Sequence, residues 1–180
     1  MASFLPTPLG LKFISAMRRF SSVSLFIFLS VLTSYGANAQ GKNPLRLGVG
    51  IAAGSTVKAP ARLVLGADAR LQIPLGNSFS GIITAGYYHF LKNDKAGNGF
   101  GIVPAKAGLK YFPVKNVYIA GEAGVGFGTK TYQKNSFMYS PSAGLAFGNG
   151  LDISIKYEEY TRYDGYASQL ALRLAYGFKL

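Results

Sequence analysis

Alternation between apolar residues and small or polar residues runs through most of the chain after Ala39, and it is strictest at the C-terminus. One face of that last segment carries apolar and aromatic side chains: Leu170, Leu172, Leu174, Tyr176, Phe178 and Leu180. The other face carries small or polar side chains: Gln169, Ala171, Arg173, Ala175, Gly177 and Lys179. A period of two residues is the pattern of a β-strand whose two faces meet different surroundings. The alternation therefore predicts a chain built of strands.

The N-terminal segment differs from the rest of the chain and is typical of an export signal. Positive charge at Lys12, Arg18 and Arg19 precedes an apolar stretch at 23–32, and Ala37-Asn38-Ala39 fits the small-residue cleavage pattern. The apolar stretch is shorter than the roughly 20 residues that a membrane-spanning helix needs. We predict a signal peptide over residues 1–39, with Ala37 and Ala39 as its cleavage positions, and one domain over residues 40–180.

Eight stretches after the signal are predicted to be strands. They lie near residues 45–54, 62–73, 78–91, 102–112, 117–129, 137–147, 151–161 and 168–180. Their connections alternate between tight turns and longer polar loops, as in outer-membrane barrels. An even number of strands also lets the sheet close without exposed edges. We predict an all-β fold: an eight-stranded antiparallel up-and-down transmembrane β-barrel, preceded by a cleavable signal peptide.

The pattern does not decide the faces of the third stretch, and two prolines fall within predicted strands. In the third stretch Ile82 and Ile83 are adjacent, so alternation does not decide which face is apolar. Pro104 and Pro141 fall within the fourth and sixth stretches. Because proline has no backbone N–H to donate, we place both near the rim of the barrel on the side of the long loops.

The composition of the second face indicates which face meets lipid. A soluble barrel of the lipocalin type would present a face rich in Lys, Glu, Thr and Gln to water. Here that face is dominated by small residues, such as Gly48, Gly50, Ala52 and Gly54, which suit a narrow eight-stranded interior. Aromatic residues gather near the strand ends on the apolar face, as in membrane girdles: Phe79, Tyr111, Phe127, Phe137, Tyr157, Tyr176 and Phe178. A membrane barrel is favoured, and a soluble secreted lipocalin-like ligand-binding barrel is the alternative.

Over residues 40–180 the chain resembles the small outer-membrane β-barrel family of OmpA/OmpX-like type, whose members are often labelled porin-family or outer-membrane β-barrel domain proteins. The resemblance rests on the signal, on the stretch 117–129 (VYIAGEAGVGFGT) and on the terminal strand ending LAYGFKL. It implies a Gram-negative outer-membrane location and the barrel assembly machinery as a partner. It also implies a C-terminal insertion signal formed by Tyr176, Phe178 and Leu180. The final Leu departs from the Phe in which many members end.

Charged residues on the small-residue face are expected inside the barrel or at its mouths: Arg46, Arg62, Asp68, Arg70, Lys106, Lys110, Glu122, Asp152, Lys156, Glu158, Arg173 and Lys179. Buried charges are tolerated when they are paired or solvated. Glu122 lies in the middle of its stretch, and we expect Lys106 beside it, with Arg70 or Arg173 reaching it across the interior. We predict a structural ion-pair network of Arg70, Lys106, Glu122 and Arg173, and no catalytic carboxylate.

Several functional classes find little support in the sequence. The absence of cysteine excludes disulfides and thiolate zinc sites. The net charge of +12 comes from singly scattered Lys and Arg, so anionic lipid is a better partner than nucleic acid. The single histidine, His89, has no serine or acid at a catalytic spacing, and the glycines at 121–126 precede more strand instead of the helix of a phosphate loop. We expect no enzyme activity, no cofactor, no metal and a monomer.

The leading functional hypothesis is an outer-membrane barrel with a structural or interaction role, whose partners are outer-membrane lipid and lipopolysaccharide. Lys92, Lys95, Lys130 and Lys134 fall in the predicted long loops, where they could meet lipid phosphates or simply be solvated. The alternative in the membrane is a narrow porin-like channel. A general diffusion pore is not expected, because eight strands enclose barely enough room for their own side chains.

Overall fold

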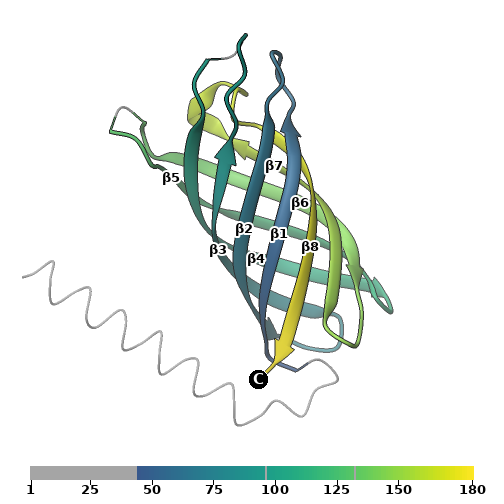
Figure 1. Ribbon diagram of the computed structural model, residues 1–180. Coiled ribbons are helices and arrows are strands. Elements are labelled where there is room, and N and C mark those ends of the chain that lie inside the picture. The colour runs from purple at the N-terminus through teal and green to yellow at the C-terminus, as the bar shows by residue number, and fades with distance from the viewer. Residues whose placement is uncertain (1–43, 96, 132) are drawn as a thin grey trace, which may run out of the picture. The chain divides into compact units, whose positions relative to one another are not determined.

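Eight antiparallel strands close into a barrel in the computed structural model, which describes residues 44–95, 97–131 and 133–180 (Figure 1). The strands are β1 (Arg46–Thr56), β2 (Leu63–Pro74), β3 (Phe79–Phe90), β4 (Phe100–Val114), β5 (Val117–Gly128), β6 (Ser136–Ala146), β7 (Leu151–Tyr160) and β8 (Gln169–Lys179). Every strand bound lies within two residues of its sequence-based prediction. The predicted eight-stranded up-and-down barrel is confirmed. The predicted signal peptide, with Ala37 and Ala39, lies outside the described residues.

The barrel closes because each strand pairs with its neighbours in the chain and β8 pairs back with β1. The closing register runs from Arg46 opposite Lys179 to Thr56 opposite Gln169, so it covers the whole of both strands. Closure gives the backbone groups of β1 and β8 hydrogen-bond partners, which hydrocarbon cannot supply. The barrel therefore exposes no unpaired sheet edge.

The two ends of the barrel differ. Short connections at 75–78, 115–116 and 147–150 lie at the end where β8 and the chain finish, which we call the turn end (Figure 1). Longer connections at 57–62, 91–99, 129–135 and 161–168 lie at the opposite end, which we call the loop end. The last of these loops begins with a 3-10 turn, η1 (Thr161–Tyr163), and within the described ranges no helix is long and apolar enough to cross a bilayer.

Burial alternates along the strands in the predicted phase. In β8 the side chains of Ala171, Arg173 and Ala175 are buried, whereas Leu170, Leu172 and Leu174 are exposed. Large apolar side chains that are 45–64% exposed cover the outside of the barrel, among them Ile51, Leu65, Leu109, Ile119, Ile155 and Leu172. Charges inside and aliphatic groups outside are the reverse of a soluble barrel. This distribution defines a transmembrane barrel and argues against the lipocalin-like alternative.

Strand pairing decides the face of β3, which alternation in the sequence left open. Thr84 lies opposite Arg70 of β2 and Lys106 of β4, both of which point inward. Ile82 is consequently buried in the interior, and Ile83 faces outward and is half-buried. The two adjacent isoleucines therefore belong to opposite faces of one regular strand.

The two prolines occupy different positions. Pro104 is the fifth residue of β4, near the loop end, as predicted. The placement predicted for Pro141 was wrong, because this residue is the sixth of the eleven residues of β6. Its ring faces outward, and pairing between β6 and β7 skips Ser140 and Pro141 before it resumes in the same register. The absence of the proline N–H therefore interrupts the pairing of β6 with β7 only locally, and the same residues of β6 face inward on both sides of the interruption.

Aromatic side chains form a belt on the outside near each end of the barrel. At the turn end Phe79 stacks on Tyr111 with ring centroids 4.7 Å apart, and Tyr176 meets Phe178 edge-on at 5.0 Å. At the loop end the outward-facing rings are paired as Tyr87 with His89 and Tyr139 with Tyr157. Rings with polar tips at both ends of an apolar band match the two interfaces of a bilayer.

We predict that Leu174→Arg lowers the stability of the inserted barrel by about 2–4 kcal/mol, because it puts a cation against hydrocarbon near the midplane. Leu174 is the sixth of the eleven residues of β8 and lies opposite Ile51 in the middle of β1. The measurement is reversible unfolding from lipid vesicles in denaturant, followed by the mobility difference between unboiled and boiled samples.

The matched control is Leu47→Arg, at an outward position one residue from the end of β1. Near the interface the cation reaches water, so the expected loss is about 0–1 kcal/mol. Equal losses for the two variants would contradict the assigned depth of β1 and β8.

Candidate functional site: the charged interior and the basic loop end

The interior of the barrel holds a continuous chain of alternating charges. Successive members lie within 4 Å of each other, and they come from β2, β4, β5, β7 and β8. The order of the chain is Arg70, Glu122, Lys106, Glu158, Lys156, Asp68, Arg173, Asp152 and Lys110. A cation stands at each end, so five cations share four carboxylates. We call this set the charge chain.

The pair of Asp68 and Arg173 is the most tightly bonded link in the charge chain. The Nε atom of Arg173 donates to both carboxylate oxygens at 3.0 and 2.9 Å, and Nη2 donates to Oδ1 as well. The hydroxyl of Tyr88 adds a hydrogen bond to Oδ2 at 2.9 Å. Both charged side chains are 1% exposed. A forked, charge-assisted contact of this kind is among the strongest that a buried carboxylate can make.

Glycine on β1 makes the link between β8 and β2 possible. Asp68 and Ala175 are the residues opposite Gly50, on β2 and β8 respectively. A Cβ atom at position 50 would lie 2.8 Å from Nη2 of Arg173. The guanidinium group therefore passes over β1 in the space that Gly50 leaves empty. This is the physical use of one of the small residues that the sequence places on the inward face.

Glu122 is bound by three strands. It accepts hydrogen bonds from Nη2 of Arg70 at 3.0 Å and from Oγ1 of Thr84 at 2.6 Å, and Nζ of Lys106 lies 3.5 Å away. The structure thus brings Arg70 and Lys106 to Glu122, as the sequence analysis expected. It places Arg173 elsewhere, on Asp68, because β8 is next to β1 and the gap at Gly50 leads to β2.

Glu158 is the most crowded carboxylate of the interior. It accepts hydrogen bonds from Lys106 at 2.5 Å, from Lys156 at 3.2 Å and from the side-chain amide of Gln169 at 2.5 Å. Lys156 also donates to the hydroxyl of Tyr88. Every one of these side chains is buried, so the cost of desolvating the carboxylate is offset only by these contacts.

The last link of the charge chain lies toward the turn end. Asp152 accepts hydrogen bonds from Lys110 at 2.6 Å and from the hydroxyl of Tyr118 at 2.7 Å. The ammonium group of Lys110 also lies over the ring of Tyr118, 3.6 Å from its centroid. A cation–π contact inside a protein stabilises a desolvated ammonium group. Both charged groups at this end of the charge chain, Asp152 and Lys110, therefore have direct partners.

On the loop side of the charge chain the lumen is filled by packed rings. Phe90 stacks on Phe100 at 4.5 Å between centroids and meets Tyr160 edge-on at 6.3 Å, and Phe100 stacks on Tyr163 at 6.2 Å. Phe90, Tyr160 and the neighbouring Ile102 and Met138 are fully buried. We call these rings and their neighbours the aromatic layer. The aromatic layer and the charge chain both lie inside the barrel, one toward the loop end and the other beside it.

The aromatic layer and several neutral partners of the charge chain were not singled out from the sequence. Tyr118 stands between Val117 and Ile119, so it has the inward phase, and the same holds for Tyr160 after Glu159. This phase was available as a signal. Small and charged residues dominate the inward positions of the sequence, so the aromatic residues were assigned to membrane girdles on the outer face. The phase also puts Gln169 on the inward face, but its partner, like that of Thr84, depends on which strands face each other across the lumen.

The loop end is basic. Seven cations in the described loops face two carboxylates, and the cations are Lys58, Arg62, Lys92, Lys95, Lys130, Lys134 and Arg162. Some of them tie loops together through carbonyl groups: Lys58 donates to Asp164 at 2.8 Å and Lys130 donates to Gly99 at 2.8 Å. Lys92 and Asp94 form an exposed ion pair at 3.8 Å. Carbonyl contacts do not cancel charge, so this end carries an excess of positive charge toward its surroundings.

The remaining residues named from the sequence lie on the outer surface. Tyr176, Phe178 and Leu180 are exposed on one face, where β8 ends. His89 is exposed at the loop end of β3, and its Nδ1 atom lies 3.1 Å from the hydroxyl of Tyr87. The histidine thus belongs to the outer aromatic belt.

Comparison with known proteins supports this architecture at the level of the fold. No family model matches the chain, and no curated protein sequence matches it. The solution NMR structure of the de novo designed TMB2.3 is similar, with a TM-score of 0.55 and 16% identity over 79% of this chain and 99% of that chain. The backbone structure of the Yersinia pestis outer membrane protein Ail in a phospholipid bilayer nanodisc gives a TM-score of 0.54 and 15% identity over 74% of this chain and 99% of that chain.

The crystal structure of Yersinia pestis Ail gives a TM-score of 0.52 and 16% identity over 76% of this chain and 97% of that chain. Identities this low show a shared fold and nothing finer. The fold is that of eight-stranded outer-membrane β-barrels. The resemblance to the OmpA/OmpX-like family is supported at this coarser level, as an outer-membrane barrel.

We predict that Arg173→Leu destabilises the folded barrel by about 3–5 kcal/mol, because it leaves the carboxylate of Asp68 buried without its main partner. Replacing both partners, as Asp68→Leu with Arg173→Leu, is expected to restore most of the loss, since no uncompensated charge remains. Unfolding in denaturant, measured for both single variants and the double variant, gives the coupling.

The control is Arg46→Leu, the same kind of change at a half-buried position on the rim of the turn end. There we expect a loss of at most about 1 kcal/mol. A double variant that is no more stable than Arg173→Leu alone would contradict the pairing of Asp68 with Arg173.

Proposed function

We propose that this protein is an integral outer-membrane barrel with a structural and interaction role. In this proposal the aliphatic outer surface and its two aromatic belts anchor the barrel. The loop end contacts the phosphate groups of lipopolysaccharide or external partners. The observation that carries the proposal is the combination of an apolar outside with a concentration of cations in the long loops, where seven of them face two carboxylates. The two features together describe a protein held in one orientation against an anionic leaflet.

The terminal strand supports delivery to that membrane by the barrel assembly machinery. Tyr176, Phe178 and Leu180 present their side chains outward from the strand that closes the barrel. Export through the predicted signal peptide at residues 1–39 is part of the same proposal. The closed sheet also supports a monomer, because it offers no unpaired edge to a second copy.

Contact with lipopolysaccharide is supported by the charge of the loop end. Lys95 and Lys134 are exposed and lie in different loops, β3–β4 and β5–β6, so their charges are spread around the rim. Exposed cations attract phosphate groups over a distance of about 10 Å at moderate salt. The belt that contains Tyr87 and His89 lies below these loops, where lipid head groups meet the acyl chains.

A conducting function finds no support in this interior. The aromatic layer contains rings with no exposure to solvent, and the charge chain below it is formed by direct contacts between side chains. The same argument applies to catalysis at the interior carboxylates, because each of the four is held by two or more hydrogen bonds or ion pairs. We propose that the protein is neither a porin nor an enzyme.

Lipopolysaccharide is predicted to raise the unfolding temperature of the barrel in detergent micelles, and Lys95→Gln with Lys134→Gln is predicted to remove at least half of that rise. The physical reason is the loss of two exposed cations that face lipid phosphates, so high salt should also reduce the rise. Gel mobility of unboiled samples heated to a series of temperatures measures both.

The control variant carries Lys115→Gln with Lys179→Gln, which removes two exposed cations from the turn end. It should keep the full effect of lipopolysaccharide. If the two double variants responded alike, contact through the loop end would be refuted.

In planar lipid bilayers we predict no stepwise conductance from the purified barrel, because the aromatic layer and the charge chain obstruct the lumen. Single-channel recording over a range of voltages is the measurement. Discrete current steps that scale with the amount of inserted protein would contradict the plugged interior and favour the narrow channel.

A further inference from the structure

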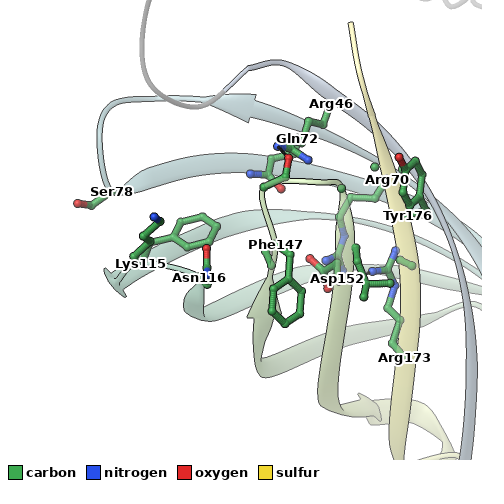
Figure 2. Close-up of a pocket in the computed structure, with 18 of the residues that line it drawn as sticks. Arg46, Arg70, Gln72, Ser78, Lys115, Asn116, Phe147, Asp152, Arg173 and Tyr176 are labelled. Carbon is green, nitrogen blue, oxygen red and sulfur yellow. Dashed lines mark hydrogen bonds and ion pairs between the residues drawn. The ribbon is translucent and has the colours of Figure 1, made fainter.

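A cavity occupies the turn end of the lumen (Figure 2), and its lining includes Arg70, Asp152 and Arg173 of the charge chain but no residue of the aromatic layer. Its volume is about 670 Å³, which lies within the range of small-molecule sites. The short turns form its rim, with Ser78, Lys115, Asn116 and Phe147 around it, and β2 and β8 contribute its deeper wall (Figure 2). We call this cavity the vestibule.

Most of the charged residues that line the vestibule are cations. Four cations contribute to its surface, and they are Arg46, Arg70, Lys115 and Arg173. Asp152 is the one carboxylate among its lining residues. That carboxylate is already occupied by Lys110 at 2.6 Å and by the hydroxyl of Tyr118 at 2.7 Å. Arg70 and Arg173 are also paired with Glu122 and Asp68, so the excess of positive charge in the lining comes from Arg46 and Lys115.

The charge chain ends at this cavity with an incomplete partner set. Arg70 donates through Nε to Thr84 at 3.1 Å and through Nη2 to Glu122 at 3.0 Å. Its third nitrogen, Nη1, is buried and has no hydrogen-bond partner among the residues that the structure describes. The side chain is 6% exposed. A buried guanidinium N–H without an acceptor is costly, so an acceptor is expected to complete it.

The two ends of the charge chain differ in this respect. Lys110 is the other terminal cation of the charge chain, and its ammonium group lies over the ring of Tyr118 and against Asp152. Arg70 is held by Thr84 and Glu122 through two of its nitrogens, but among the charged side chains described it alone has a buried polar atom without a hydrogen bond. The charge chain has five cations and four carboxylates, so it offers no further carboxylate to Nη1 of Arg70.

We propose that the vestibule is a binding site for an oxyanion, the phosphate group of a small molecule that enters from the turn end. In this site Arg70 donates through Nη1, and Arg46 adds positive charge nearer the rim. Gln72, Ser78 and Asn116 offer neutral donors on the same lining. A guanidinium group partly fixed by two other acceptors is preorganised for phosphate, since little side-chain entropy is lost when it binds. The site lies at the end opposite the loop cations, so it is independent of the proposed contact with lipopolysaccharide.

One glycine allows the site to be blocked without touching Arg70. Gly48 lines the vestibule and lies directly opposite Arg70 on the neighbouring strand. A Cβ atom at position 48 would meet backbone atoms at 3.4–3.7 Å, which is ordinary contact. The variant Gly48→Glu therefore places a carboxylate beside Arg70 as an internal competitor for the same donor.

The test is titration of the folded barrel in detergent micelles with inorganic phosphate at constant ionic strength. Calorimetry gives the affinity, and the side-chain ¹⁵N–¹H resonance of Arg70 reports the site. We expect saturable binding by the wild-type protein. Arg70→Gln and Gly48→Glu should each weaken it at least tenfold, whereas Arg162→Gln, the matched change at the exposed loop end, should alter it less than twofold.

Further titrations distinguish the source of the phosphate group. Glycerol phosphate represents a soluble ligand and short-chain phosphatidylglycerol represents a lipid head group. Acetate, a monoanion like the phosphodiester of phosphatidylglycerol, tests a carboxylate. Saturable binding of either phosphate compound that Gly48→Glu abolishes supports the site and identifies its source. Tighter binding of acetate than of phosphate would overturn the assignment to phosphate.

Absence of saturable binding by all of these probes would overturn the proposal. So would affinities that are equal in wild type, Arg70→Gln and Gly48→Glu. The mobility difference between unboiled and boiled samples shows whether each variant is folded. If Arg70→Gln does not fold, Gly48→Glu keeps Arg70 in place and decides the outcome alone.

Discussion

The rest of the structure depends on the pairing of backbone groups where no water is available to replace it. Hydrocarbon accepts no hydrogen bonds, so the sheet closes on itself and β8 pairs with β1 along the full length of both strands. Closure with eight strands leaves a narrow interior. Every charge on the inward face is then forced close to the others, and the alternating chain from Arg70 to Lys110 is the arrangement in which most of them find an opposite charge.

The interior is layered along the barrel, and the layers have different consequences. Rings such as Phe90 and Phe100 fill the loop side by packing, without polar contacts to satisfy. The middle is held by charge pairs such as Asp68 with Arg173, which specify which strands face each other but contribute less net stability than their number implies. The turn side is open as the vestibule. In the proposal above, this order leaves the barrel closed to through-passage and accessible from the turn end, which is the geometry of a binding pocket more than of a pore.

Sequence patterning predicted nearly all of the fold and about half of the interior. A period of two residues determines which side chains share a face, so β8 and its Leu170 to Leu174 row could be assigned without coordinates, and Arg70 and Lys106 could be placed near Glu122. The destination of Arg173 could not be predicted, because it depends on the gap at Gly50 and on the order of strands around the barrel. The mid-strand position of Pro141 was missed for a related reason. Propensity argues against proline inside a ladder, whereas the tertiary structure tolerates one local gap between β6 and β7.

The sequence by itself determined the strands, their number and, except in β3, the face that most side chains take, because these follow from local alternation and from the residues that make turns. Only the tertiary structure decided which charges meet across the lumen, which aromatic rings close it and which guanidinium nitrogen lacks an acceptor. Those outcomes depend on contacts between residues far apart in the chain, such as Asp68 with Arg173 and Lys106 with Glu158. Their distances are set by barrel closure and register, and no periodicity within a single strand carries that information.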